Sequence, residues 1–297
     1  MSPFASILVP LDGSRVAARS LGCATWLAAR LGARLHILSA TPRERPAREE
    51  LTRLQVPEEH WPLVTLLQAP AYPEDAILAA VARHDVSLVV MSAVGETAEA
   101  GPAADADSAG VVGHVTRAIL ERSPVPVLLL PPAYRETLPW ERLLVPVSGE
   151  PEGDEALALA VRLANALGLE VHVAHVAGAD TGDESLAARA RYADAIHHEY
   201  PHQLQELVAR ALPHCGAEES RCIVDVALCH GDVAGELLGL MERKRVSVLV
   251  VGWHGRFATG RASILKHLIR AISSPVLLVK RTVRRPFRLK VGEEIER

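Results

Sequence analysis

Aromatic residues are scarce in this chain: Phe, Trp and Tyr together make up 4% of its 297 residues. Four cysteines are too few to form a disulfide scaffold in a chain of this size. No stretch reaches the roughly 18 uninterrupted apolar residues that a membrane-spanning helix needs, and the first residues lack the pattern of a secretion signal. These absences predict a globular protein of the cytoplasm.

Neither sign of charge dominates, because the formal net charge is −4 at pH 7. This balance gives no electrostatic reason to expect a nucleic acid or an anionic membrane as a partner. Three common catalytic signatures are also missing: the G-x-S-x-G elbow, the G-x4-G-K-[ST] loop and the H-E-x-x-H zinc motif. We therefore expect a binding protein and no enzyme.

The most informative pattern is an internal repeat. "SILVPLDGS" at residues 6–14 is echoed by "RLLVPVSGE" at residues 142–150, and an amphipathic helical pattern follows each copy. The ends of the two halves also correspond, residues 85–93 to 245–253 and residues 114–130 to 263–279. Each half reads as five short apolar strands alternating with helices.

Strands that alternate with helices predict a parallel sheet covered on both faces, because parallel strands need crossover connections. We predict an α/β protein of two tandem five-stranded domains, at residues 1–132 and 141–282, joined by a linker at 133–140. The charged residues 283–297 form an extension. If the first strand of each half is central, a ligand crevice lies between the turns after the first and fourth strands.

With "ILVPLDGS", "VVGWHG…AS…SPVLLV" and the doubled layout, residues 6–280 resemble a tandem universal stress protein. The resemblance implies the adenine nucleotide alpha hydrolase-like fold and, in many members, ATP. An Asp after the first strand contacts the adenine side, and a G-x2-G-x9-G-[ST] loop after the fourth strand holds ribose and phosphates. It also implies that residues 124–130 and 274–279 pair within the chain.

The first half matches the Asp of this pattern but not its loop. Asp12 follows the strand that ends near Pro10, although Asp-Gly-Ser is also ordinary turn chemistry, and we expect Ser14 to be a helix N-cap. Met91 and Val94 stand where the pattern has its first two glycines, with Gly95 one place late. Gly113 matches the last glycine, but His114 replaces Ser or Thr. Four carboxylates, Glu96, Glu99, Asp105 and Asp107, oppose a polyphosphate there.

The second half has the opposite defect. Gly252 and Gly255 match the first glycine pair, and Ala262-Ser263 stand for the final Gly-Ser after a gap shorter than nine residues. We expect Ser263 to cap the next helix and donate to a phosphate, and Arg256 and Arg261 to neutralise charge. Ser148, after Pro146, replaces the Asp. We predict the second loop to be the better phosphate site of the two.

The second half is also rich in histidine and cysteine: His197, His198, His202, His214, Cys215, Cys222, Cys229 and His230. None of the cysteines has the C-x2-C spacing typical of zinc sites, so we expect no metal here. The resulting interpretation is a stress-response protein that binds ATP or a related adenine nucleotide, with Mg²⁺ only as a companion of ATP. Two alternatives stay open: a scaffold acting through protein contacts or another small ligand, and a metal-dependent protein using these histidines. The protein partners are not identified, and further homo-oligomerisation stays open.

Overall fold

The computed structural model describes residues 2–95, 112–148, 151–178, 219–257 and 262–280. Within these residues the first domain runs from β1 to β5 and the second from β6 to β10. The first contains β1 Ser6–Pro10, α1 Arg15–Ala18, α2 Ser20–Leu31, β2 Arg34–Ala40, α3 Ala47–Arg53, the 3-10 helix η1 Glu58–Leu63, β3 Val64–Ala69, α4 Pro73–Arg83, β4 Leu88–Ser92, α5 His114–Arg122 and β5 Val127–Leu130.

The second domain repeats this order. It contains β6 Arg142–Pro146, α6 Pro151–Leu167, β7 Glu170–Gly178, the 3-10 helix η5 Glu219–Cys222, β8 Ile223–Gly231, α8 Val233–Arg243, β9 Val248–Trp253, α9 Ser263–Ala271 and β10 Val276–Lys280. The predicted alternation of strands and helices is therefore confirmed in both halves.

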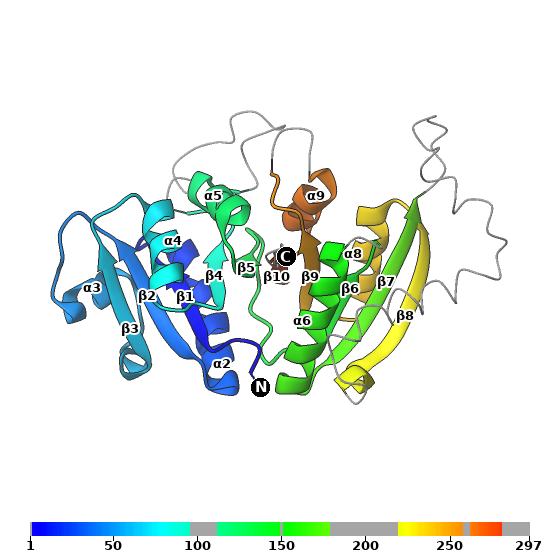
Figure 1. The fold of residues 1–297 in the computed structure, drawn as a ribbon, viewed down its shortest axis with the longest axis horizontal. Coiled ribbons are helices and arrows are strands. Elements are labelled where there is room, and N and C mark those ends of the chain that lie inside the picture. The colour runs from blue at the N-terminus through cyan, green and yellow to red at the C-terminus, as the bar shows by residue number, and fades with distance from the viewer. Residues whose placement is uncertain (1, 96–111, 149–150, 179–218, 258–261, 281–297) are drawn as a thin grey trace, which may run out of the picture.

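The ten strands of the described residues belong to one sheet, in the order β3-β2-β1-β4-β5-β10-β9-β6-β7-β8. Strands within a domain pair in parallel, whereas β5 and β10 pair antiparallel, with Leu129 opposite Val276. These two strands lie at the centre of the molecule (Figure 1). The sequence predicted a five-stranded sheet in each domain and pairing of the two fifth strands. That pairing is present, and it joins the two sheets into one, so that neither apolar edge strand is left unpaired.

Helices cover both faces of this sheet (Figure 1). One face carries α2, α3 and α6, and the other carries α4, α5, α8 and α9, each over its own cluster of buried apolar side chains. The strands β4 and β5 are buried along their whole length, as expected of parallel strands covered on both sides. None of the helices in the described parts of the chain is long and apolar enough to span a membrane.

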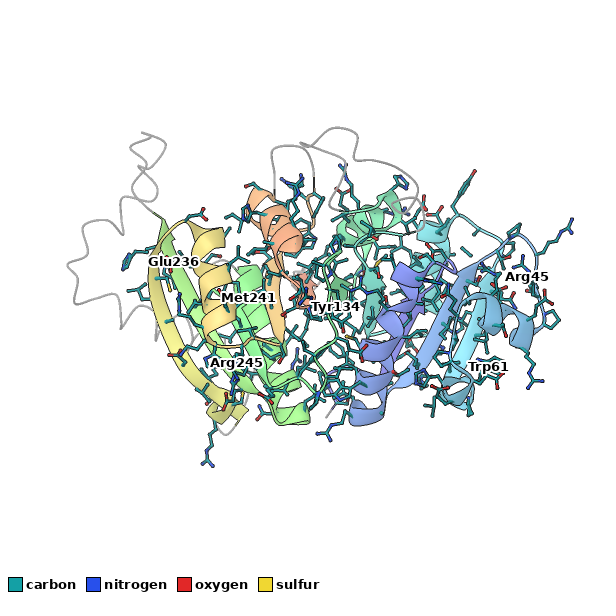
Figure 2. The ribbon with its side chains drawn as sticks, turned by 180° about the vertical axis from the view of Figure 1, so that it is seen from behind. Arg45, Trp61, Tyr134, Glu236, Met241 and Arg245 are labelled. Carbon is teal, nitrogen blue, oxygen red and sulfur yellow. The ribbon has the colours of Figure 1, made fainter. Side chains whose placement is uncertain are left out.

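The junction between the domains is packed into the core. Tyr134 and Trp140 are each 3% exposed, and the Trp140 ring lies 5.0 Å from that of Trp26 on α2. The Tyr134 hydroxyl lies 2.8 Å from the Cys23 sulfur, and Tyr134 sits midway between the two domains in Figure 2. Burial raises the pKa of the Cys23 thiol to about 12, so this sulfur stays protonated. The predicted linker thus contributes to a core shared by both domains.

Candidate functional site

In the first domain, β1 lies between β2 and β4, which places the turns after β1 and β4 side by side, as the sequence predicts. Pro10 ends β1, and Asp12 follows it. A Cβ added to Gly95 would lie 2.9 Å from Asp12 Oδ2, and one added to Gly113 would lie 3.8 Å from the Gly95 amide nitrogen. Asp12, Gly95 and Gly113 therefore meet at the carboxyl edge of the sheet.

The Asp12 side chain has two roles in this geometry. Its Oδ1 accepts a hydrogen bond from the Ser14 amide at 2.8 Å, which is the turn chemistry expected from Asp-Gly-Ser. Ser14 in turn caps α1 by accepting from the Ala17 amide at 3.1 Å, so the predicted N-cap is confirmed. Asp12 is exposed, and its Oδ2 lies so close to Gly95 that a side chain on Gly95 would crowd it.

Helix α5 begins at this point. Its N-cap residue is Gly113, whose amide donates to the Ala93 carbonyl at 2.7 Å. Gly113 has no side-chain acceptor to offer the amides of the first turn, in contrast to Ser14 on α1 and Asp232 on α8. A helix N-terminus without a side-chain cap can receive an anion, because its amides and dipole both favour negative charge.

A buried ion-pair network supports the Asp12 turn from the side of α3. Glu50 is fully buried and accepts hydrogen bonds from Arg53, Arg45 and Ser39, the shortest ion-pair distance being 2.6 Å to Arg53. These donors, Arg53 foremost, hold the pKa of Glu50 at about 2 even though burial opposes ionisation. Arg53 also donates to the Asp12 carbonyl at 3.1 Å. The network fixes the backbone that carries the Asp12 carboxylate.

The strand register corrects one prediction about the first-domain loop. Leu8 pairs with Val89, and its counterpart Leu144 pairs with Leu249, so Ser92 and Gly95 occupy the positions of Gly252 and Gly255. The prediction that Met91 and Val94 stand there, with Gly95 out of place, was wrong by one residue. The second glycine of the pattern is present.

Ser92 contacts the point at which the first helix of this domain is interrupted. Its hydroxyl donates to the Val16 carbonyl at 2.7 Å, the carbonyl that an unbroken α-helix would offer to the Ser20 amide. The chain turns at Arg19 and restarts as α2, whereas α6 in the second domain, opposite Gly252, is continuous. The two domains therefore differ both in the residue at this position and in the helix packed against it.

The second domain lacks a carboxylate at the equivalent turn. Pro146 ends β6, and Ser148 is exposed where Asp12 stands in the first domain. The preceding carbonyl, of Val147, accepts a hydrogen bond from His175 Nδ1 at 2.8 Å. A serine hydroxyl cannot supply the charge that Asp12 offers to an amine or hydroxyl of a ligand.

Protein atoms already surround the two glycines of the second-domain loop. A Cβ at Gly252 would lie 2.5 Å from the backbone of Glu152 at the start of α6. Gly255 has a left-handed conformation with φ 79° and lies against Lys280. A Cβ added to Gly255 would lie 3.1 Å from the Cε of Lys280. Close packing by itself requires glycine at Gly252, so a bulky substitution there would disturb the fold whatever it did to a ligand.

The remaining predicted loop residues are only partly brought together. Ser263 is the exposed first residue of α9, and the N-cap position belongs to Ala262, so the expectation that Ser263 caps this helix was wrong. Arg256 is exposed, and its amide donates to His254 Nδ1 at 3.1 Å. Arg261 and the acidic residues 96–107 lie outside the described residues, and their expected effect on charge stays a prediction.

The metal alternative finds no support in the part of the chain that the structure describes, where no group of three or more His, Cys, Asp or Glu side chains is placed to hold an ion. His197, His198, His202, His214 and Cys215 lie outside that part.

Comparison with known proteins settles the family. The sequence model of the universal stress protein family matches residues 3–131 and, a second time, residues 139–280. This chain belongs to the universal stress protein family. The tandem arrangement inferred from the internal repeat is confirmed, while the domain boundaries at 132 and 141 stay predictions. No curated protein matches the chain.

Solved structures support the fold of this universal stress protein over nearly its whole length. A functionally unknown protein from Pseudomonas aeruginosa PAO1 is 18% identical, with a TM-score of 0.62 over 94% of this chain and 93% of its own. A universal stress protein from Archaeoglobus fulgidus DSM 4304 is 17% identical, with a TM-score of 0.57 over 95% of this chain and 99% of its own. At these identities the likeness extends to the fold alone.

Several residues that shape the site were not predicted from the sequence. Glu50 and Arg53 support the Asp12 turn, and Trp253 and Lys280 donate hydrogen bonds to the C-terminal end of α5. Only Trp253 lies within a quoted motif, at a position for which the pattern specifies no residue. The one available signal was a Glu and an Arg three residues apart in a helical pattern, which usually indicates an exposed pair.

Proposed function

We propose that this universal stress protein binds an adenine nucleotide, ATP or a related compound, at the carboxyl edge of its first domain. The observation that carries the proposal is the convergence of the Asp12 carboxylate, Gly95 and the N-terminus of α5 at one point. The stress-response role implied by the family would depend on the bound state and needs no catalytic step.

The chemistry of this edge fits the two ends of a nucleotide. Asp12 is exposed, and its carboxylate can accept from an amine or hydroxyl of the nucleoside. The amides at the start of α5 are donors suited to phosphate oxygens, and the small residues Gly95 and Gly113 allow close approach to the backbone. Where the nucleotide is ATP, Mg²⁺ would accompany its phosphates.

The second domain offers a weaker site by the same criteria. Ser148 carries no charge, and Gly252 and Gly255 pack against α6 and Lys280. Although the sequence favours the second loop, the surroundings of the two loops therefore lead us to propose the first domain as the principal site.

Calorimetric titration of ATP with Mg²⁺ into the purified protein tests this proposal, after denaturation of a sample to detect any nucleotide carried from the cell. Replacing Asp12 by Ala should weaken binding about tenfold or more, because it removes a charged hydrogen-bond partner. Ser148→Ala is the matched control at the equivalent position and should leave the affinity unchanged.

Two results would contradict the proposal. Absence of ATP binding by the wild-type protein would favour the scaffold alternative. An equal loss of affinity in Asp12→Ala and Ser148→Ala would show that the first domain has no privileged role.

A further inference from the structure

The C-terminal end of helix α5, in the first domain, is held by side chains and backbone of the second domain. Trp253 Nε1 donates to the Leu120 carbonyl at 2.8 Å. Lys280 Nζ donates to the Glu121 carbonyl at 2.6 Å and to the Ser123 carbonyl at 3.2 Å. The Phe257 amide donates to Glu121 Oε1 at 3.2 Å. We refer to Trp253, Phe257 and Lys280 as the α5 clasp.

These contacts satisfy groups that a helix cannot satisfy by itself. The last carbonyls of an α-helix have no partner within the helix, and they carry the negative end of its dipole. An ammonium group and a buried indole N–H are suitable donors there. Burial lowers the pKa of Lys280, and the nearby Glu121 carboxylate opposes this effect. The clasp thus places donors where the helix end requires them.

The aromatic residues of the clasp pack on one another. Trp253 is 4% exposed, stacks on His254 at 4.7 Å and meets the Phe257 ring edge-on at 5.8 Å. Gly255 turns the chain in a left-handed conformation directly against the Lys280 side chain. The glycine that the sequence assigns to a phosphate loop therefore lets this loop close onto Lys280.

The first domain has no side-chain donors at the positions equivalent to Trp253 and Lys280. The strand register places Ala93 at the position of Trp253 and Pro131 at the position of Lys280. Neither Ala nor Pro has a side-chain donor. At these two described positions the first domain therefore offers α9 no counterpart of the Trp253 and Lys280 donors.

Helix α5 connects the clasp to the candidate site. It has nine residues and is therefore only about 13 Å long. Two hydrogen bonds hold its N-terminal end. The Gly113 amide donates to the Ala93 carbonyl, and the Thr116 hydroxyl donates to the Ser92 carbonyl at 3.0 Å. In so short a helix, a displacement of the clasped end would also move the end at the Asp12 turn and strain these two hydrogen bonds.

We propose that the α5 clasp sets the position of helix α5, so that Lys280 and Trp253 of the second domain are positioning residues for anion binding in the first. The identity of the anion rests on the function proposed above, whereas the positioning of α5 by the clasp does not. In this arrangement the second-domain loop serves the site of its neighbour.

Hydrogen exchange of the nucleotide-free protein tests the positioning directly. Lys280→Met keeps the apolar stem and removes the donors, and it should speed exchange of the Gly113 and Arg117 amides about tenfold. Trp253→Phe removes a single donor and should give a smaller increase, about fivefold. Lys244→Met is the matched control, because Lys244 pairs with Asp225 at 2.9 Å beside β8, and it should leave both amides unchanged.

ATP titration of the same variants separates this proposal from the proposed function. Lys280→Met should weaken ATP binding about tenfold, and Lys244→Met should not. Faster exchange in the clasp variants of a protein that does not bind ATP would support the positioning role of the clasp and contradict the proposed nucleotide binding. Unchanged exchange at Gly113 and Arg117 in the two clasp variants would overturn the proposal that the clasp positions α5. An increase in exchange rate of equal size throughout α4 would also overturn the proposal. If Lys280→Met fails to fold, the exchange measured in Trp253→Phe decides between these outcomes.

Discussion

Ala262 adopts a backbone conformation that residues other than glycine rarely take, with φ 56° and ψ 29° immediately before α9. The methyl group makes this left-handed conformation unfavourable by roughly 1–2 kcal/mol. The equivalent N-cap of α5 is Gly113, which has φ −64° and no such strain. Equivalent positions in the two domains therefore carry different residues in different conformations.

Replacing Ala262 by Gly should relieve this strain and raise the free energy of unfolding by about 0.5–1 kcal/mol, the gain being reduced by the greater freedom of glycine in the unfolded chain. Urea unfolding measures the change. The reciprocal variant Gly32→Ala is the control, since Gly32 has φ 64° and a Cβ there would contact nothing within 4 Å. It should lower the free energy of unfolding by about 1 kcal/mol. A loss of stability in Ala262→Gly would contradict the assigned strain.

Helix α3 has only seven residues, too few to be stable in isolation, and its place against β2 depends on Glu50. This buried carboxylate joins the helix to Ser39 on β2 and, through Arg53, to the backbone of the Asp12 turn. Arg45, which contributes a further hydrogen bond, lies toward the outer end of the first domain in Figure 2. A helix of marginal stability thus holds the turn that we propose as part of a binding site.

Glu50→Gln should lower the free energy of unfolding at pH 7 by about 2 kcal/mol or more, because it breaks a buried ion-pair network. The folded-state pKa of Glu50, about 2, lies below its ordinary value of 4.5. The stabilisation is therefore complete above pH 4.5 and declines as the pH falls toward 2, by at most about 1.4 kcal/mol per pH unit.

Unfolding measured by urea at pH 7, 5 and 3.5 checks this dependence. The difference between wild type and Glu50→Gln should shrink at pH 3.5. The exposed neighbour Glu49, changed to Gln, should give a small difference at every pH. A difference for Glu50→Gln that stays constant down to pH 3.5 would contradict the lowered pKa.

At the scale of the whole molecule, the antiparallel pair β5–β10 makes one sheet of two domains, and Tyr134 and Trp140 place the junction in the shared core. We expect the described domains to unfold in a single cooperative transition, because separating them would expose two apolar strand edges. Far-UV circular dichroism and tryptophan fluorescence should therefore give coincident thermal midpoints. Two separate transitions would contradict this expectation.

Much of the fold could be predicted because its signals are local and occur twice. The run of Ile7, Leu8 and Val9 before Pro10 indicates a buried strand, and the copy at residues 143–146 makes the repeat clear. The site was less predictable. Recognising Gly95 as the first-domain equivalent of Gly255 depends on strand register, because the loops that follow β4 and β9 differ in length. A count of residues alone misplaced it by one position.

The sequence by itself determined the tandem α/β architecture, the family and the position of Asp12, since periodic apolar runs and a repeated motif are properties of the chain order. Only the tertiary structure decided what each loop contacts. Gly252 and Gly255 read as phosphate-loop glycines, yet they lie against Glu152 and Lys280, and the loop of one domain holds a helix of the other. The contacts of Trp253 and Lys280 with α5 join residues more than 100 positions apart, and the pairing of β5 with β10 brings them together.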